Sequence, residues 1–208
     1  MIGIIDYGMG NLKSVSNAFR ALGFDAFIAS RPDELDRADK IVLPGVGAFE
    51  GAIAELRRGG WDERVKESAR AGIPLIGICL GMQLMFEKSC ENGSHSGLGL
   101  FPGHVVRIPD GFSPDRKKLK IPQVGWNKLE MRKKSAILSS SDDVYVYFVH
   151  SYYAVTEPEY VSSVTSYGVD ITASVERENV FGAQFHPEKS GEHGLAILKK
   201  FAELKAGK

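Results

Sequence analysis

The sequence has little cysteine, no excess of charge of either sign and no long uninterrupted apolar run. Cys79 and Cys90 have neither metal-ligand nor redox spacing, and two cysteines do not make a disulfide framework. The 26 basic and 26 acidic residues cancel, which argues against a nucleic-acid or membrane-surface partner. One basic cluster, Arg116-Lys117-Lys118 with Lys120, is either a solvated loop or a patch that faces a partner.

The absence of a long apolar run also bears on where the protein is located. Residues 73–86 form the longest apolar stretch, but glycine and proline interrupt it and it is too short to cross a bilayer. The opening segment reaches Asp6 too soon for a signal peptide. We therefore expect a cytoplasmic protein that needs no metal or other cofactor, with one domain over residues 1–208.

Strand and helix patterns alternate in the first half of the chain. Apolar runs predict strands over 2–6, 24–29, 40–43 and 74–78, and helical spacing predicts helices over 11–22, 48–56, 62–71 and 80–88. Asn11 is the expected N-cap of the first helix, and Gly23 its stop. This alternation predicts an α/β fold with a doubly wound, mostly parallel sheet.

The pattern changes after Gly93. β-Branched and aromatic runs predict strands over 105–108, 145–149, 152–155, 172–176 and 180–184, with a hairpin connection at 177–179. A closing amphipathic helix is expected over 195–204. The sheet should therefore carry an added antiparallel section.

Cys79 occupies the turn in Gly77-Ile78-Cys79-Leu80-Gly81, directly after an apolar run. This is the nucleophile-elbow pattern with sulfur in place of a serine hydroxyl. The turning residue is strained, and a Cβ two positions away would collide with it, so glycine is needed on both sides. The thiol would then lie at a helix N-terminus, where the dipole favours thiolate. Taken alone, the pattern fits a buried core cysteine equally well.

A second chemical pair follows the last predicted strand, in His186-Pro187-Glu188. A carboxylate two residues from a histidine can fix its tautomer and stabilise the imidazolium after proton uptake. Proline between them narrows the geometries available to the pair. The competing interpretation is a histidine in a turn, with Glu188 in solvent.

Three further segments sit where strands end. Pro44-Gly45-Val46-Gly47 leads from a strand into a helix, either as a tight turn or as a source of backbone N–H donors beside that of Leu80. Gln83 lies one turn beyond Cys79 on the same side of its helix. His150-Ser151-Tyr152 closes an apolar strand and either lines a site or begins a loop.

Together these segments resemble the class I, or triad, glutamine amidotransferases, which share the order Cys, His, Glu. The resemblance implies that Cys79 attacks glutamine, His186 transfers the proton and Glu188 orients His186. It implies an oxyanion hole from the N–H groups of Val46 and Leu80. The residues implied to bind glutamine are Gly47, Gln83, His150, Ser151 and Tyr152.

A narrower similarity, to members that supply ammonia for histidine biosynthesis, rests on residues 6–12, 44–49 and 122–127. It implies a heterodimer with a cyclase subunit that is a (β/α)8 barrel. Candidate contacts with that partner are Asn11, Trp126, Tyr147 and Lys189. The family commonly has His-Met where this chain has Gln123-Val124, near the partner face.

Three alternatives remain open at this stage. A paralogous glutaminase subunit would keep the chemistry and feed a different synthase. A cysteine peptidase could use the same fold, although Gln83 and the His-Ser-Tyr segment disfavour it. A binding subunit without activity is disfavoured by the intact Cys79, His186 and Glu188.

Overall fold

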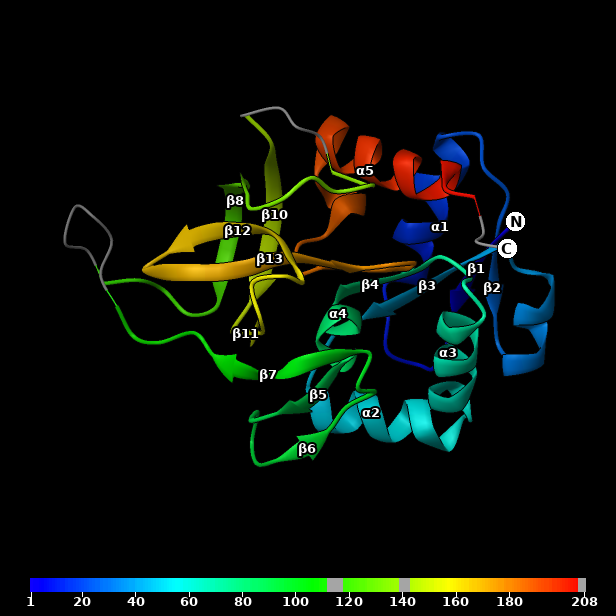
Figure 1. Ribbon diagram of the computed structural model, residues 1–208, viewed down its shortest axis with the longest axis horizontal. Helices are drawn as coiled ribbons and strands as arrows, with labels where there is room; N and C mark the ends of the chain where they lie inside the picture. Colours follow the sequence, from blue (N-terminus) through cyan, green and yellow to red (C-terminus); the bar gives the residue numbers. More distant parts are fainter. Residues whose placement is uncertain (112–117, 139–142, 206–208) are drawn as a thin grey trace.

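The computed structural model describes residues 1–111, 118–138 and 143–205. Its main sheet has eight strands in the order β2-β1-β3-β4-β14-β13-β12-β9 (Figure 1). Five strands are parallel neighbours: β2 (Ala26–Ala29), β1 (Ile2–Ile5), β3 (Lys40–Gly45), β4 (Leu75–Cys79) and β14 (Val180–Ala183). Three antiparallel strands continue the sheet: β13 (Val169–Arg177), β12 (Val161–Tyr167) and β9 (Glu130–Met131). The predicted α/β class, with a mostly parallel sheet and an antiparallel section, is confirmed.

Helices and smaller sheets cover the two faces of the main sheet (Figure 1). One face packs against α1 (Leu12–Ala21), α5 (Gly191–Glu203) and a two-stranded sheet of β8 (Gln123–Lys128) and β10 (Tyr145–His150). The other face packs against α2 (Phe49–Arg58), α3 (Trp61–Arg70) and a four-stranded sheet of β11 (Tyr152–Val155), β7 (Phe101–Arg107), β5 (Phe86–Ser89) and β6 (His95–Ser96). Two short 3₁₀ helices are η1 (Pro32–Arg37) and η2 (Pro187–Lys189).

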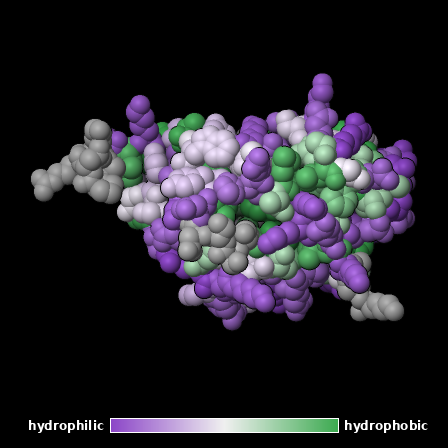
Figure 2. All heavy atoms as spheres, turned by 90° about the horizontal axis from the view of Figure 1, so that it is seen from above, coloured by the Kyte–Doolittle hydropathy of each residue, from purple (hydrophilic) through white to green (hydrophobic). Residues whose placement is uncertain are grey.

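Figure 2 shows the molecule from the side of α1 and α5. Apolar and weakly hydrophilic side chains gather there between strongly hydrophilic ones. Among the described residues, no helix has both the length and the apolar character needed to cross a membrane.

The first helix has the ends expected from its sequence. The Asn11 side chain accepts a hydrogen bond from the Ser14 N–H at 3.4 Å, which is the N-cap interaction. Gly23 follows the helix with a φ of +81°, a conformation that suits glycine. The Asn11 side chain is thus engaged in holding α1.

The predicted helix over 80–88 is wrong beyond Leu84. The helix α4 covers only Leu80–Leu84, and β5 begins at Phe86. The Met85 carbonyl, which a longer helix would use, accepts the N–H groups of Leu100 and Phe101 instead. Phe86 is fully buried, with its ring centroid 5.6 Å from that of Phe101. Tertiary packing therefore overrides the helical spacing.

The sequence prediction also differs from the structure at several other elements. The sequence does not predict β12, because Ser162, Ser163 and Thr165 break its apolar pattern although all three are buried. It likewise misses β8, β6 and β9, and it starts the last helix four residues late, since α5 begins at Gly191. The hairpin at 177–179 is confirmed. Arg116 and Lys117 lie outside the described residues.

The turn after β4 depends on the close approach of α4 to β3. A Cβ on Gly81 would lie 1.9 Å from the Leu43 carbonyl oxygen, so only glycine fits there. We expect Gly81→Ala to lower the free energy of unfolding by about 3 kcal/mol, measured by urea denaturation. The control is Gly51→Ala within α2, where the nearest atom, Met9 Cε, is 4.0 Å away, and stability should hold or rise. Equal stability of Gly81→Ala and the parent would contradict this account.

Candidate active site

Cys79 stands at the junction of β4 and α4 in a strained conformation. Its φ of 54° and ψ of −112° make it one of three non-glycine residues with positive φ in the described chain. Such a conformation costs about 1–3 kcal/mol and persists only where the surroundings enforce it. A Cβ on Gly77 would lie 2.7 Å from the Gly81 carbonyl oxygen, as the elbow pattern predicts. The predicted strand-to-helix turn at Cys79 is confirmed.

His186 and Glu188 face each other behind the cysteine. The His186 Nδ1–H donates to Glu188 Oε1 at 2.8 Å, and the two side chains are 3% and 1% exposed. Because the Glu188 side chain is buried, the solvent-facing interpretation of this residue is wrong. The carboxylate fixes the tautomer, so Nε2 is the ring nitrogen left for Cys79.

The backbone around His186 is tied to β10. The His186 N–H donates to the Tyr147 carbonyl at 2.9 Å. The Ser190 hydroxyl donates to the His186 carbonyl at 2.6 Å and accepts the Tyr147 N–H at 2.9 Å. These bonds fix the position of the imidazole relative to β10.

The electrostatics of the pair favour the charged ring. Burial lowers the pKa of His186, but hydrogen bonds to Cys79 and Glu188 and the charges of both groups outweigh it, and the pKa rises to about 9. At neutral pH the ring is therefore an imidazolium beside the sulfur, able to protonate a leaving group.

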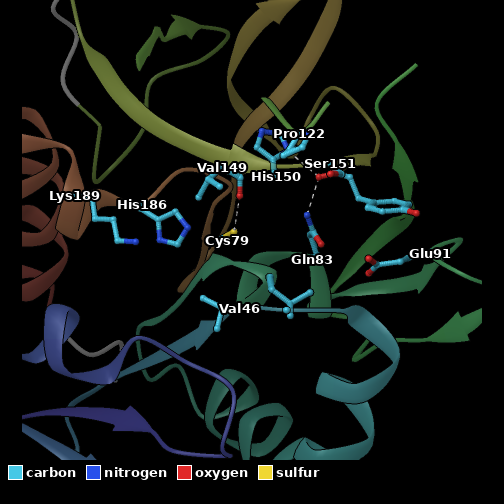
Figure 3. A pocket seen from close by; sticks show the side chains of 13 residues that line it. Val46, Cys79, Gln83, Glu91, Pro122, Val149, His150, Ser151, His186 and Lys189 are labelled. Atoms are coloured by element: carbon cyan, nitrogen blue, oxygen red, sulfur yellow. Dashed lines mark hydrogen bonds between the residues drawn. The ribbon is translucent and has the colours of Figure 1, made fainter. Parts of the chain in front are cut away.

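A cavity of about 390 Å³ opens in front of Cys79 and His186 (Figure 3). Its walls come from the ends of β3, β4 and β14, from α4 and from the β10–β11 connection, with Glu91 and Pro122 from two other loops. The sequence-predicted residues that line it are Val46, Gly47, Cys79, Leu80, Gln83, His150, Ser151, Tyr152, His186 and Lys189. Among the described residues, no group of three or more His, Cys, Asp or Glu side chains could hold a metal ion.

One expected oxyanion donor is engaged elsewhere. The Val46 N–H donates to the Met9 carbonyl at 3.3 Å, so it is not available to an oxyanion in the cavity. The neighbouring Tyr7 hydroxyl donates to the Pro44 carbonyl at 2.9 Å. The loop before α1 is thus hydrogen-bonded both to the end of β3, at Pro44, and to the residue after it, Val46.

Gln83 and His150 share one backbone acceptor. Gln83 Nε2 and His150 Nδ1 both donate to the Tyr152 carbonyl, at 2.8 Å and 2.9 Å. Burial lowers the pKa of His150 to about 4, because its bond to Tyr152 compensates only in part and the charge of His186 lowers it further. His150 is therefore neutral where His186 is charged.

The structure adds cavity residues that the sequence did not single out. The Glu91 carboxylate accepts the Phe49 N–H at 2.7 Å, at the start of α2, and lines the cavity. Nothing in its neighbourhood, Cys90-Glu91-Asn92, indicates that role. Gln184 lies behind the cavity and does not line it, and its Nε2 is 3.8 Å from Cys79 Sγ.

The candidate partner contacts differ in their relation to the cavity. Trp126 is 53% exposed, and its ring lies 6.2 Å from that of Tyr147 across the β8–β10 pair. Val124, on the same face of β8, is 58% exposed. Lys189 lines the cavity itself. An exposed tryptophan next to an exposed valine on one strand face is typical of a surface that meets another protein.

The model of the family described as "glutamine amidotransferase class-I" matches residues 3–204. The chain belongs to the class I glutamine amidotransferases. Two solved structures of similar fold are a glutamine amidotransferase (18% identity, TM-score 0.75, 98% of this chain and 99% of that one) and PurLQS from Thermotoga maritima (19% identity, TM-score 0.75, 96% of each).

Curated relatives narrow the place of this glutamine amidotransferase within its family. The imidazole glycerol phosphate synthase subunit HisH of Geobacillus sp. is 50% identical, over 100% of this chain and 99% of the relative. The subunit of the same name from Methanothermobacter thermautotrophicus is 48% identical, over 98% of each.

Removal of the sulfur should change the titration of His186. In Cys79→Ala the hydrogen bond and charge of Cys79 are lost while burial remains, so the pKa of His186 should fall below about 9. An NMR titration of the ring would measure it. Cys90→Ala, an exposed cysteine, is the matched control and should leave the titration unchanged. An unaltered His186 midpoint in Cys79→Ala would show that the sulfur does not contact the ring.

Proposed function

We propose that this chain is the glutaminase subunit of imidazole glycerol phosphate synthase. It hydrolyses glutamine to glutamate and ammonia and passes the ammonia to a cyclase subunit, which uses it in histidine biosynthesis. The observation that carries the proposal is the meeting of Cys79 and His186 at one cavity, with Glu188 bonded to the far ring nitrogen. The full-length similarity to HisH subunits supports this choice of synthase.

The proposed reaction uses the three groups in sequence. The Cys79 thiolate attacks the side-chain carbonyl carbon of glutamine, and the His186 imidazolium protonates the departing ammonia. Water, deprotonated by His186, then cleaves the thioester to glutamate. Glu188 holds the ring and offsets its charge throughout, since its Oε1 accepts from Nδ1 at 2.8 Å.

The cavity offers complementary groups for a free amino acid. The Glu91 carboxylate suits the α-ammonium group of glutamine. Both N–H groups of Gln83 are bonded within the protein, so its amide oxygen is the atom left to accept from the substrate. Gly47, His150, Ser151 and Tyr152 complete the proposed glutamine site, His150 as a neutral ring that fixes the Tyr152 carbonyl.

The oxyanion hole needs the N–H groups of Leu80 and Val46. The Val46 N–H donates to the Met9 carbonyl, so rotation of the Gly45–Val46 peptide must free it before fast turnover. Gly45 lacks a Cβ, and Gly47 adopts a φ of +95°, which gives this loop the freedom to rotate. Loss of one such donor typically lowers a rate about 10²–10³-fold. We propose that docking of the partner drives the rotation.

The proposed partner is a (β/α)8-barrel cyclase, bound as a heterodimer. Trp126 is exposed and packs against the half-buried Tyr147, and the exposed Val124 extends this surface along β8. Lys189 lines the cavity, and we propose that ammonia released at Cys79 leaves on its side toward the partner. Asn11 caps α1 and follows Met9, whose carbonyl accepts the Val46 N–H. Asn11 is a further proposed contact with the partner. A cytoplasmic location suits a free thiol nucleophile, which works in a reducing compartment.

Substitution of the nucleophile tests the reaction. We expect Cys79→Ala to abolish glutamine-dependent synthesis, measured as glutamate release with the cyclase present, while ammonia-dependent synthesis and the heterodimer persist. The surface is untouched, so binding should match that of the parent. Cys90→Ala is the control and should keep full activity. Normal glutaminase activity in Cys79→Ala would refute the assignment of the nucleophile.

Turnover by the isolated chain tests the oxyanion switch. Because the Val46 N–H is held by Met9, the chain alone should release glutamate about 10²–10³-fold more slowly than the complex. The assay compares the chain with and without the cyclase at saturating glutamine. Equal rates in the two samples would remove the switch from the mechanism.

A further inference from the structure

The sulfur of Cys79 has a neighbour that the triad does not include. Gln184 follows β14, is fully buried, and its Nε2 donates to Cys79 Sγ at 3.8 Å. Its Oε1 accepts from Gln83 Nε2 at 2.9 Å. Two side-chain amides therefore connect the sulfur to Gln83 in the wall of the glutamine cavity, where Figure 3 shows Gln83 near Cys79.

The orientation of both amides follows from one backbone carbonyl. The Tyr152 carbonyl can only accept, so Gln83 must turn its nitrogen toward it. The second N–H of Gln83 is then directed at Gln184, whose side-chain oxygen must accept the hydrogen bond. Gln184 is left with its nitrogen toward Cys79, as a donor.

A donor at this position favours one protonation state of the sulfur. A thiolate can only accept hydrogen bonds, and Gln184 supplies one. The Val149 carbonyl, 4.0 Å from Sγ on another side, can only accept, and so it suits the protonated thiol. Gln184 opposes that preference together with His186, whose hydrogen bond to Cys79 also comes from a donor nitrogen.

We propose that Gln184 is a further catalytic residue, which donates its amide N–H to the Cys79 thiolate, and that Gln83 positions it. This inference rests on the proposed role of Cys79 as nucleophile. Gln184 does not line the cavity, so its loss acts on the reactivity of the sulfur and not on the affinity for glutamine. Gln83, in contrast, belongs to both the chain of amides and the substrate wall.

The test is the pH dependence of alkylation at each cysteine of the full chain. Iodoacetamide is the probe, and mass spectrometry separates Cys79 from the exposed Cys90. Gln184→Met keeps the volume but has no donor. We expect it to slow Cys79 alkylation at neutral pH about tenfold and to raise the midpoint of the profile by about one pH unit, with Cys90 unchanged. In the complex, kcat should fall while KM stays within about twofold.

Ser174→Ala is the matched control. It removes a buried hydrogen bond, Ser163 Oγ to Ser174 Oγ at 2.7 Å, on the strand next to Gln184, without a contact to the sulfur. Its Cys79 profile should equal that of the parent. A folded Gln184→Met with an unshifted profile overturns the proposal. The proposed function stands in that case, because it depends on Cys79→Ala and not on this profile.

A second variant and a measurement on the parent cover a failure to fold. Gln184→Glu keeps the shape and still accepts from Gln83, but it places an acceptor beside the sulfur, so the loss should exceed that of Gln184→Met. In the parent chain, the Gln184 side-chain amide resonance should follow the titration of the sulfur and stay flat with pH in Cys79→Ser. A resonance that is indifferent to Cys79 in both proteins overturns the proposal.

Discussion

The strained turn at Cys79 is the constraint on which the other features of the site depend. Its positive φ exists because α4 packs so closely on β3 that Gly81 touches the Leu43 carbonyl, and because Gly77 leaves room beneath. β3 and β14 flank β4 in parallel, so their loops end beside the same sulfur. The proposed nucleophile, the proposed base and the loop of Val46 are therefore brought together at one sheet edge. The order of the strands therefore determines most of the site's geometry, as is general for doubly wound sheets.

The division of charge inside the site follows from two histidines with opposite surroundings. His186 has a carboxylate and a sulfur as neighbours, and its pKa is about 9. Deep burial lowers the pKa of His150 to about 4, since its bond to the Tyr152 carbonyl compensates only in part and the charge of His186 lowers it further. At neutral pH one ring is a proton donor and the other a fixed, uncharged spacer. The Tyr152 carbonyl connects the spacer to Gln83, so the neutral ring also sets the direction of the amides behind the cavity.

The sequence predicts the parts of this molecule whose signals are local. The elbow at Cys79, the cap at Asn11 and the hairpin at 177–179 follow from residue type and spacing. The helix over 80–88 fails because a distant strand takes the Met85 carbonyl, and β12 is hidden because its buried positions carry hydroxyls. Glu91 joins the cavity only through the fold. The direction of the Val46 N–H is a property of a peptide plane and not of a side chain, so no residue pattern encodes it.

Ser190 connects β10 to the backbone of His186. Its hydroxyl is bonded to both the Tyr147 N–H and the His186 carbonyl, and the His186 N–H returns to Tyr147. The strand that carries Tyr147 and the backbone of His186, the proposed catalytic base, are thus held together through the Ser190 hydroxyl. Because these bonds join β10 to the backbone of His186, the position of the imidazole depends on the position of the strand that carries the proposed docking face.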